Sequence, residues 1–195
     1  MKKLYCFDFD GTLTYKDTMF LYLKFYNKSK FNMQFLKHVP LFVLLKLNLA
    51  DAEKVKKSFV GSILKGESQE KIEKQADAFC QKYYPVLFRQ NALDFIKNID
   101  REKTESYIVS ASLDIWVKPF AEKLGMNLLA TQAEFVNGRF TGNFTTPNCN
   151  GEEKVHRIVN AVKDQRFDKK IAFGDTSGDK PMLAWADESF YQFFH

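Results

Sequence analysis

The chain has 195 residues, carries a formal net charge of +5 at pH 7 and is 45% hydrophobic. This length allows one ordinary domain plus a sizeable insertion, and the apolar content is sufficient for a core, which excludes a disordered chain. Three scattered cysteines exclude a disulfide framework or a CxxC zinc site, so we expect reduced thiols in a cytoplasmic protein. Asp8 interrupts the N-terminus before a signal peptide can form, and the longest apolar stretch, 39–49, falls short of the ~20 residues that a membrane span needs.

The first apolar run, residues 4–7, stops at the sequence Asp8-Phe9-Asp10-Gly11. An Asp-Gly pair flanked by apolar residues is a strong hairpin signal, so a type I′ turn is one interpretation. The run is continuous rather than alternating, however, which favours a strand buried on both faces of a parallel sheet. Asp17-Thr18 then indicates the start of a helix and not a return strand. The acids are therefore expected at the carboxyl end of a central strand, where open α/β sheets bind ligands.

Helical patterns dominate the chain from Asp17 to about Ile99, with Asp51 and Ser68 as N-caps. The expected helices are 17–26, 33–47, 51–65, 68–83 and 86–99. This segment is also basic: between Tyr15 and Gly66 ten lysines stand against three acids, which gives +7 and leaves −2 for the rest of the chain. We interpret residues 15–85 as a helical cap that interrupts the fold.

Strand patterns return after the cap. We expect strands at 106–109, 127–130, 170–173 and 190–194, a helix interrupted near Pro119, a helix at 151–162, and a two-residue hairpin at 136–139. Strands that alternate with helices indicate a doubly wound, mainly parallel α/β sheet. The core would comprise residues 1–14 and 86–195.

Reactive side chains stand where the expected strands meet loops or helices. Taken singly, Ser110 could be a helix cap, Lys154 a surface lysine, and Asp175 and Asp179 loop carboxylates. Lys154 is unusual because the first turn of a helix disfavours a cation, a conflict that a bound anion would remove. Carboxylates gathered at one sheet edge repel one another unless a cation joins them, and an all-oxygen set suits Mg²⁺. The set is Asp8, Asp10, Ser110, Lys154, Asp175 and Asp179.

Four segments, DFDGTLT, VSAS, GEEK and FGDTSGD, occur in this order. They resemble the four motifs of the haloacid dehalogenase-like (HAD) phosphatase superfamily, and the helical insertion resembles the small cap of its phosphoserine-phosphatase-like subfamily IB. The stretch from SASLDIWVKPFAEKLG to NCNGEEKVHRI looks most like the branch that includes bacterial phosphatidylglycerophosphate phosphatases. The resemblance implies a Rossmann-like core and a magnesium-dependent phosphomonoester hydrolase with no nucleic-acid partner.

The resemblance also implies roles for individual residues. Asp8 would be the nucleophile that forms an aspartyl-phosphate, and Asp10 would be the general acid and base, which requires a raised pKa. Mg²⁺ would be held by Asp8, Asp175 and the backbone carbonyl of Asp10. The phosphoryl oxygens would bind to Ser110, the amide of Ala111 and Lys154, while Asp179 would brace Lys154 and the waters of the metal, and Thr12 would support the site.

Three features bear on the substrate. An acid at Asp10, where related P-type pumps carry threonine, favours a phosphatase or, less often, a phosphomutase. The last motif lacks the asparagine that phosphoserine phosphatases usually show before Asp179. The cap has no arginine between Tyr15 and Arg89, which removes the usual clamp for an amino-acid carboxylate. The alternatives to a lipid-like or amphiphilic phosphate are a small soluble metabolite such as a sugar phosphate or phosphoserine, a mutase reaction, or phosphate binding without catalysis.

The apolar helices of the cap, 19–26 and 33–49, allow two interpretations. They could form an ordinary lid with an apolar core. Alternatively, because they coincide with the lysine-rich charge, they could rest on anionic membranes. The second interpretation predicts a cytoplasmic protein in peripheral contact with the inner face of the membrane.

Overall fold

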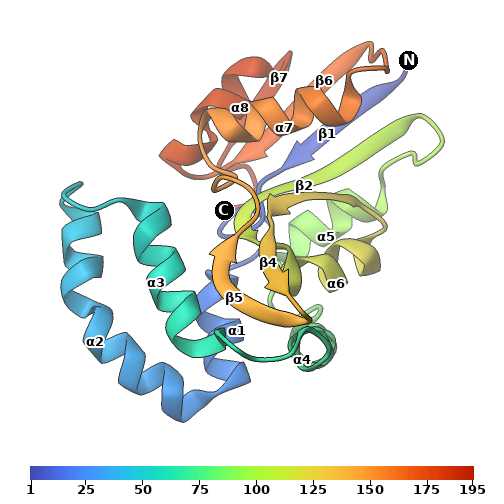
Figure 1. Ribbon diagram of the computed structural model, residues 1–195. Helices are drawn as coiled ribbons and strands as arrows, with labels where there is room; N and C mark the ends of the chain where they lie inside the picture. The colour runs from blue at the N-terminus through green and yellow to red at the C-terminus, as the bar shows by residue number, and fades with distance from the viewer.

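The computed structural model describes residues 1–195 and contains a five-stranded parallel sheet in the order β3-β2-β1-β6-β7 (Figure 1). The strands are β1 (Lys3–Phe7), β2 (Thr104–Leu113), β3 (Asn127–Thr131), β6 (Lys169–Gly174) and β7 (Glu188–Tyr191). The predicted doubly wound α/β fold is confirmed, and β1 is its central strand. The hairpin at Asp10-Gly11 is absent, because the chain continues from β1 into a helix.

Helices cover both faces of the sheet. Along β1, Leu4 and Cys6 point to the face covered by α7 (Glu152–Val162) and α8 (Lys180–Trp185), which follows the short 3₁₀ helix η1 (Ser177–Asp179). Phe7 points to the opposite face, covered by α5 (Gln90–Lys97) and α6 (Asp114–Leu124). This alternation explains why the first apolar run is continuous: successive side chains of a strand point to opposite faces, and both faces are buried.

Four helices inserted between β1 and β2 form the cap: α1 (Thr18–Tyr26), α2 (Lys28–Lys46), α3 (Ala52–Leu64) and α4 (Gln69–Tyr83). Figure 1 shows α2 and α3 projecting away from the sheet. The cap is joined to the core by Tyr22, whose ring stacks on Trp116 of α6 at 5.2 Å. One hydrophobic cluster runs through both parts. The division into a cap at 15–85 and a core at 1–14 and 86–195 stays a prediction.

The predicted hairpin is confirmed as β4 (Ala133–Val136) and β5 (Arg139–Phe144). Asn137 and Gly138 both have positive φ, 50° and 70°, as a type I′ turn requires. The hairpin pairs with the α3–α4 connection, since Gln69 N donates to Gly138 O at 2.9 Å and Phe140 N donates to Glu67 O at 3.0 Å. It therefore supports the cap and does not extend the main sheet.

Several predicted boundaries are wrong. Helix α2 begins at Lys28 and not at 33, because the Asn27 side chain accepts a hydrogen bond from Lys30 N and caps the helix. Strand β2 extends to Leu113, so Ser110 lies within the strand and not after it. Pro119 lies inside α6 and does not interrupt it. Trp116 and Phe120, on either side of the proline in the same helix, are buried in the core.

Two further elements differ in extent. Helix α5 begins at Gln90, four residues later than expected, and the last strand is 188–191 instead of 190–194. β7 is placed by its pairing with β6, in which Ile171 lies opposite Glu188. No helix combines the length and hydropathy that crossing a membrane requires.

Candidate active site

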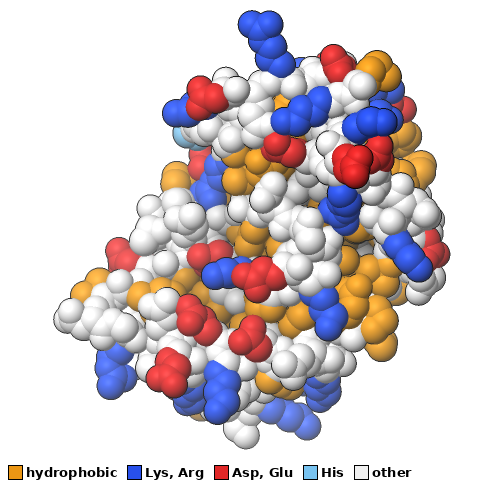
Figure 2. All heavy atoms as spheres, turned by 90° about the vertical axis from the view of Figure 1, so that its right-hand side faces the viewer, with side chains coloured by type: hydrophobic (Ala, Val, Ile, Leu, Met, Phe, Trp, Pro, Cys, Tyr) orange, Lys and Arg blue, Asp and Glu red, His pale blue; other side chains and the backbone are white.

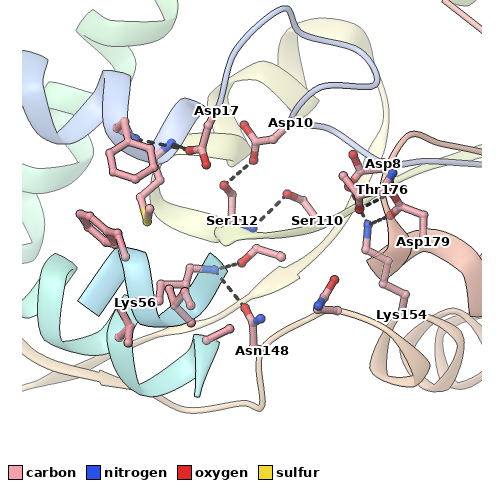
Figure 3. Close-up of a pocket in the computed structure, with 18 residues that line it drawn as sticks. Asp8, Asp10, Asp17, Lys56, Ser110, Ser112, Asn148, Lys154, Thr176 and Asp179 are labelled. Atoms are coloured by element: carbon pink, nitrogen blue, oxygen red, sulfur yellow. Dashed lines mark hydrogen bonds and ion pairs between the residues drawn. The ribbon is translucent and has the colours of Figure 1, made fainter. Parts of the chain in front are cut away.

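A cavity of about 380 Å³ lies between the carboxyl ends of the strands and the cap (Figure 3). Its core wall includes six of the residues predicted from the sequence, Asp8, Asp10, Ser110, Ala111, Lys154 and Asp179. These residues come from four segments spread along the chain from Asp8 to Asp179. The parallel topology brings them together because the carboxyl ends of all five strands lie at the same edge of the sheet.

Lys154 links two carboxylates at the base of the cavity. Its Nζ donates to Asp8 Oδ1 and Asp179 Oδ1, both at 2.6 Å, and to Val109 O at 2.8 Å, which uses all three N–H groups. The lysine side chain is only 1% exposed. Burial alone would lower the pKa of Lys154, but the two carboxylates outweigh it and raise that pKa, so the ammonium stays charged. The anion expected near this helix start is thus supplied by the protein's own Asp8 and Asp179.

Asp179 is held on both oxygens. Oδ1 pairs with Lys154, and Oδ2 accepts from Asp175 N at 3.1 Å, Thr176 N at 2.9 Å and Thr176 Oγ1 at 2.9 Å. Burial opposes its charge, yet Lys154 and Thr176 together lower the pKa of Asp179. Gly174 makes room for it, because a Cβ at that position would lie 2.4 Å from Asp179 Cβ. With both oxygens occupied, Asp179 fixes Lys154 and the turn that begins at Asp175.

Asp8, Asp175 and Asp179 form an acidic cluster in which one oxygen of each lies within 4.8 Å of the others. Thr12 Oγ1 donates to Asp175 Oδ1 at 2.8 Å. Gly11, at φ 91°, lets Asp175 approach the β1 loop, since a Cβ there would lie 2.3 Å from Asp175 Oδ2. The cluster brings together Asp8 and Asp175, the two carboxylates predicted to bind metal.

The charges of this cluster fit a divalent cation. The three carboxylates of the cluster are accompanied by one ammonium, that of Lys154, and burial raises the pKa of Asp8 to about 7 even though Lys154 opposes the shift. A metal ion would supply the missing positive charge, and oxygen ligands are those that Mg²⁺ and Ca²⁺ prefer. The carboxylate of Asp10 is not part of the cluster, so this residue could contribute only through its backbone, as predicted.

Asp10 faces the cap instead of the acidic cluster. Its Oδ1 accepts from Thr18 N, at the start of α1, at 2.6 Å, and its Oδ2 accepts from Ser112 Oγ at 2.5 Å. Burial raises the pKa of Asp10, while the hydrogen bonds from Ser112 and Thr18 oppose that increase. A carboxyl group with a raised pKa is better suited to donate a proton near neutral pH than an ordinary aspartate.

The residues predicted to bind phosphate lie where the pairing of β2 with β3 is irregular. The register shifts between Ser110 and Leu113, so Ala111 is outside the regular ladder. Ser110 Oγ accepts from Ser112 N at 3.0 Å, which leaves its hydroxyl hydrogen available to a phosphoryl oxygen. Ala111 O is already bound by Thr131 Oγ1 at 2.7 Å.

The sequence analysis missed Lys56 of α3, which reaches from the cap to the core. Its Nζ donates to Ala111 O and, at 3.0 Å, to Asn148 Oδ1 (Figure 3). Burial lowers the pKa of Lys56 to about 8, although Asp10 and Asp17 oppose the shift. A signal was present, because Lys56 shares a helix face with Phe59, Val60 and Ile63 at spacings of three, four and seven.

The rest of the cap wall is mostly apolar. Asp17, the N-cap of α1, is exposed to the cavity, where desolvation and neighbouring Asp10 raise its pKa to about 7. Around it lie apolar side chains from α1, α2 and α3, namely Met19, Phe20, Phe42, Leu45 and Val55. The cavity therefore has a charged floor and a largely apolar roof.

Residues 6–184 match the family model of the haloacid dehalogenase-like hydrolases. The chain is 36% identical over 194 residues to Protein CicA of Caulobacter vibrioides, covering 98% of this chain and 86% of that protein. A solved structure of a protein with unknown function from Bordetella pertussis Tohama I superposes with a TM-score of 0.85 at 19% identity, covering 97% and 89% of the two chains.

A substrate-bound phosphoserine phosphatase superposes with a TM-score of 0.66 at 22% identity, covering 98% of this chain and 86% of that one. At such identities the structural matches show a shared fold. The family model and the CicA similarity extend over nearly the whole chain. The chain therefore belongs to the haloacid dehalogenase-like hydrolase family, and its fold is that of the phosphatases within it.

Proposed function

We propose that the protein is a magnesium-dependent phosphomonoesterase that acts through an aspartyl-phosphate on Asp8. The observation that carries this proposal is the separation of two buried carboxylates at the end of β1. Asp8 is bound to Lys154, whereas Asp10, two residues later, is turned toward the cap and held by Thr18 and Ser112. This separation supports attack by Asp8 and proton transfer by Asp10.

The residues support the following chemistry. Asp8 attacks phosphorus, the phosphorus–oxygen bond to the alcohol breaks, and Asp10 donates its proton to the departing alkoxide. Asp10 then accepts a proton from the water that hydrolyses the aspartyl-phosphate. Ser110 and the amide of Ala111 bind the phosphoryl oxygens, and so does Lys154, whose ammonium exchanges one of its three present partners for a phosphoryl oxygen when the substrate enters.

Magnesium would be held by Asp8, Asp175 and the backbone carbonyl of Asp10, and it would add positive charge beside the phosphoryl oxygens. Thr12 supports the site through its hydrogen bond to Asp175. Asp179 supports it by fixing Lys154, with which it forms a buried ion pair.

For the substrate, we propose a lipid-like or amphiphilic phosphate. Phe20, Phe42 and Leu45 line the cavity and would contact the alcohol part of the ester. The sequence resemblance to phosphatidylglycerophosphate phosphatases agrees with this assignment. Three buried free cysteines support a reducing, cytoplasmic location. An amphiphilic substrate would bring the protein into peripheral contact with the inner face of the membrane.

A second candidate is a small soluble phosphate that carries a charged group. Asp17 and Lys56 both line the cavity and could recognise an ammonium or a carboxylate of such a metabolite. A phosphomutase or a phosphate-binding protein would use the same floor without net release of phosphate.

The test is the release of inorganic phosphate, with Mg²⁺ present, from a panel of lysophosphatidate, phosphatidylglycerophosphate, phosphoserine and sugar phosphates. We expect the highest kcat/KM for the amphiphilic esters. A higher kcat/KM for phosphoserine or a sugar phosphate would select the second candidate, and no release from any ester would refute hydrolysis.

A further inference from the structure

Helix α2 stands at the outer edge of the cap (Figure 1). It presents an apolar stripe to solvent. Met33, Leu36, Pro40 and Val43 follow one another at intervals of three or four residues, and Leu47 continues the stripe just after the helix. Met33, Leu36, Val43 and Leu47 are each at least half exposed, Leu36 as much as 75%. This spacing places the side chains on one side of the helix. They form a continuous apolar surface and are not isolated exposed residues.

The opposite side of α2 is already occupied. Phe31 and His38 are buried, and His38 Nε2 lies 3.0 Å from Ser58 Oγ of α3. Phe42 and Leu45, further along the same side, line the active-site cavity. The stripe therefore has no partner within the protein. The helical turns that carry it also carry, on their opposite side, residues of the cavity roof.

The charge on α2 indicates what covers the stripe. Residues 28–50 contain four lysines and no acidic residue, and of these Lys30 donates to Ile63 O of α3 at 2.7 Å, which leaves Lys28, Lys37 and Lys46 for the outer surface. Viewed along the helix axis, Lys28 and Lys46 lie about 80° to one side of the buried residue His38, and Lys37 lies about 100° to the other side. Lysines therefore border the stripe on both of its edges. On the side of the molecule away from α2, by contrast, positive and negative side chains are interspersed (Figure 2).

We propose that α2 is a docking surface for an anionic lipid bilayer, with the stripe inserted at the headgroup level and the lysines directed to the lipid phosphates. A second copy of this chain fits less well, since a symmetric contact would bring lysines against lysines. The proposal deepens the proposed function, because a phosphate ester leaving the bilayer would meet Phe42 and Leu45 of the same helix.

The test uses flotation of the full chain with vesicles of phosphatidylcholine alone or mixed with phosphatidylglycerol. The Asp8→Asn variant is used so that no substrate turnover contributes. We expect binding to the mixed vesicles only, and release at high salt. The double variant Leu36→Ser/Val43→Ser should weaken binding about tenfold or more, the scale expected when two apolar side chains are no longer buried.

Two matched variants complete the experiment. Val136→Ser/Val159→Ser removes exposed apolar side chains elsewhere and should leave binding unchanged, whereas Lys37→Gln/Lys46→Gln should weaken it. Failure to bind, equal binding to both vesicles, or a dimer that Leu36→Ser/Val43→Ser dissociates would overturn the proposal. Hydrolysis of p-nitrophenyl phosphate by the active chain, measured without vesicles, tests the proposed function separately and should be unaffected by the Leu36→Ser/Val43→Ser change.

Discussion

The two walls of the active-site cavity are built on different principles. On the core wall the charged side chains are fixed by ion pairs and hydrogen bonds: Lys154 uses all of its donors, and both oxygens of Asp179 and of Asp10 accept hydrogen bonds. On the cap wall most side chains are apolar, and Lys56 is held only by a carbonyl and an amide oxygen.

We interpret the core wall as the part that carries out the reaction and the cap wall as the part that recognises the alcohol of the substrate. Breaking one partner out of a buried ionic network costs about 3–5 kcal/mol, so the core wall holds its groups in a fixed arrangement. Apolar contacts on the cap are less directional, and exchanging them changes which alcohol fits without disturbing the reacting groups. We therefore expect substitutions on the core wall to act on kcat and those on the cap wall to act mainly on KM.

The largest effect is expected for Asp8→Asn. The amide has nearly the shape of the carboxylate but cannot attack phosphorus, so turnover should be abolished. Lys154 keeps its pair with Asp179, so the variant should still fold. Phosphate release and circular dichroism of the purified variant check this. Activity above a few per cent of wild type, in a folded protein, would remove Asp8 from its assigned role.

Metal removal should have a nearly equal effect. Chelation by EDTA should abolish activity and added Mg²⁺ should restore it, because the one ammonium of Lys154 does not balance the three carboxylates of the cluster. Ca²⁺ should not restore activity, since its larger and more variable coordination shell holds the nucleophile in an unproductive geometry. Full activity in the presence of chelator would contradict the metal assignment for Asp8 and Asp175.

Asp10→Asn should cause a loss that depends on the leaving group. For an alkyl phosphate, whose alkoxide must be protonated, the loss should be about 10²-fold or greater, the range of general acid catalysis. For p-nitrophenyl phosphate it should be clearly smaller, since p-nitrophenolate leaves without a proton. The amide can still accept from Thr18 N, which limits any structural effect. Equal losses for the two esters would show that Asp10 does not act as the acid.

The core wall was the part that the sequence predicted well. Short motifs place Asp8, Asp10 and Lys154 next to elements with strong patterns, and parallel topology then brings strand ends together whatever the length of chain between them. The contact of Asp179 with Lys154 was also predicted, but the sequence could not predict that Lys154 pairs with Asp8 as well, nor that Ser110 lies inside β2. Both depend on tertiary geometry and on the register of neighbouring strands.

The cap was predicted less well. The four helices were recognised, but the start of α2 was placed too late, because Asn27 was not identified as the N-cap residue of that helix. Lys56 was not distinguished from the neighbouring Lys54 and Lys57. Its spacing to Phe59, Val60 and Ile63 indicates an inward-facing side chain, but local sequence does not tell that this side of the helix borders a cavity. The contacts of Lys56 to Ala111 and Asn148 join segments 55 and 92 residues away.

The smallest effect, and the one that tests the cap wall alone, is expected at Lys56. Because the pKa of Lys56 is about 8, the cap wall loses its positive charge as the pH rises through that value. The KM for a phosphomonoester should therefore increase above pH 8 in the wild type, while kcat changes little.

Lys56→Arg should remove this pH dependence, since a guanidinium remains charged throughout this range, and Lys57→Arg, one residue further along α3, is the matched control that should retain it. The measurement is KM and kcat from pH 6 to pH 10 for the three proteins. An identical rise of KM in Lys56→Arg would assign the titration to another group. A change confined to kcat would mean that Lys56 acts on the chemical step. The assignment of kcat to the core wall and of KM to the cap wall would then be wrong.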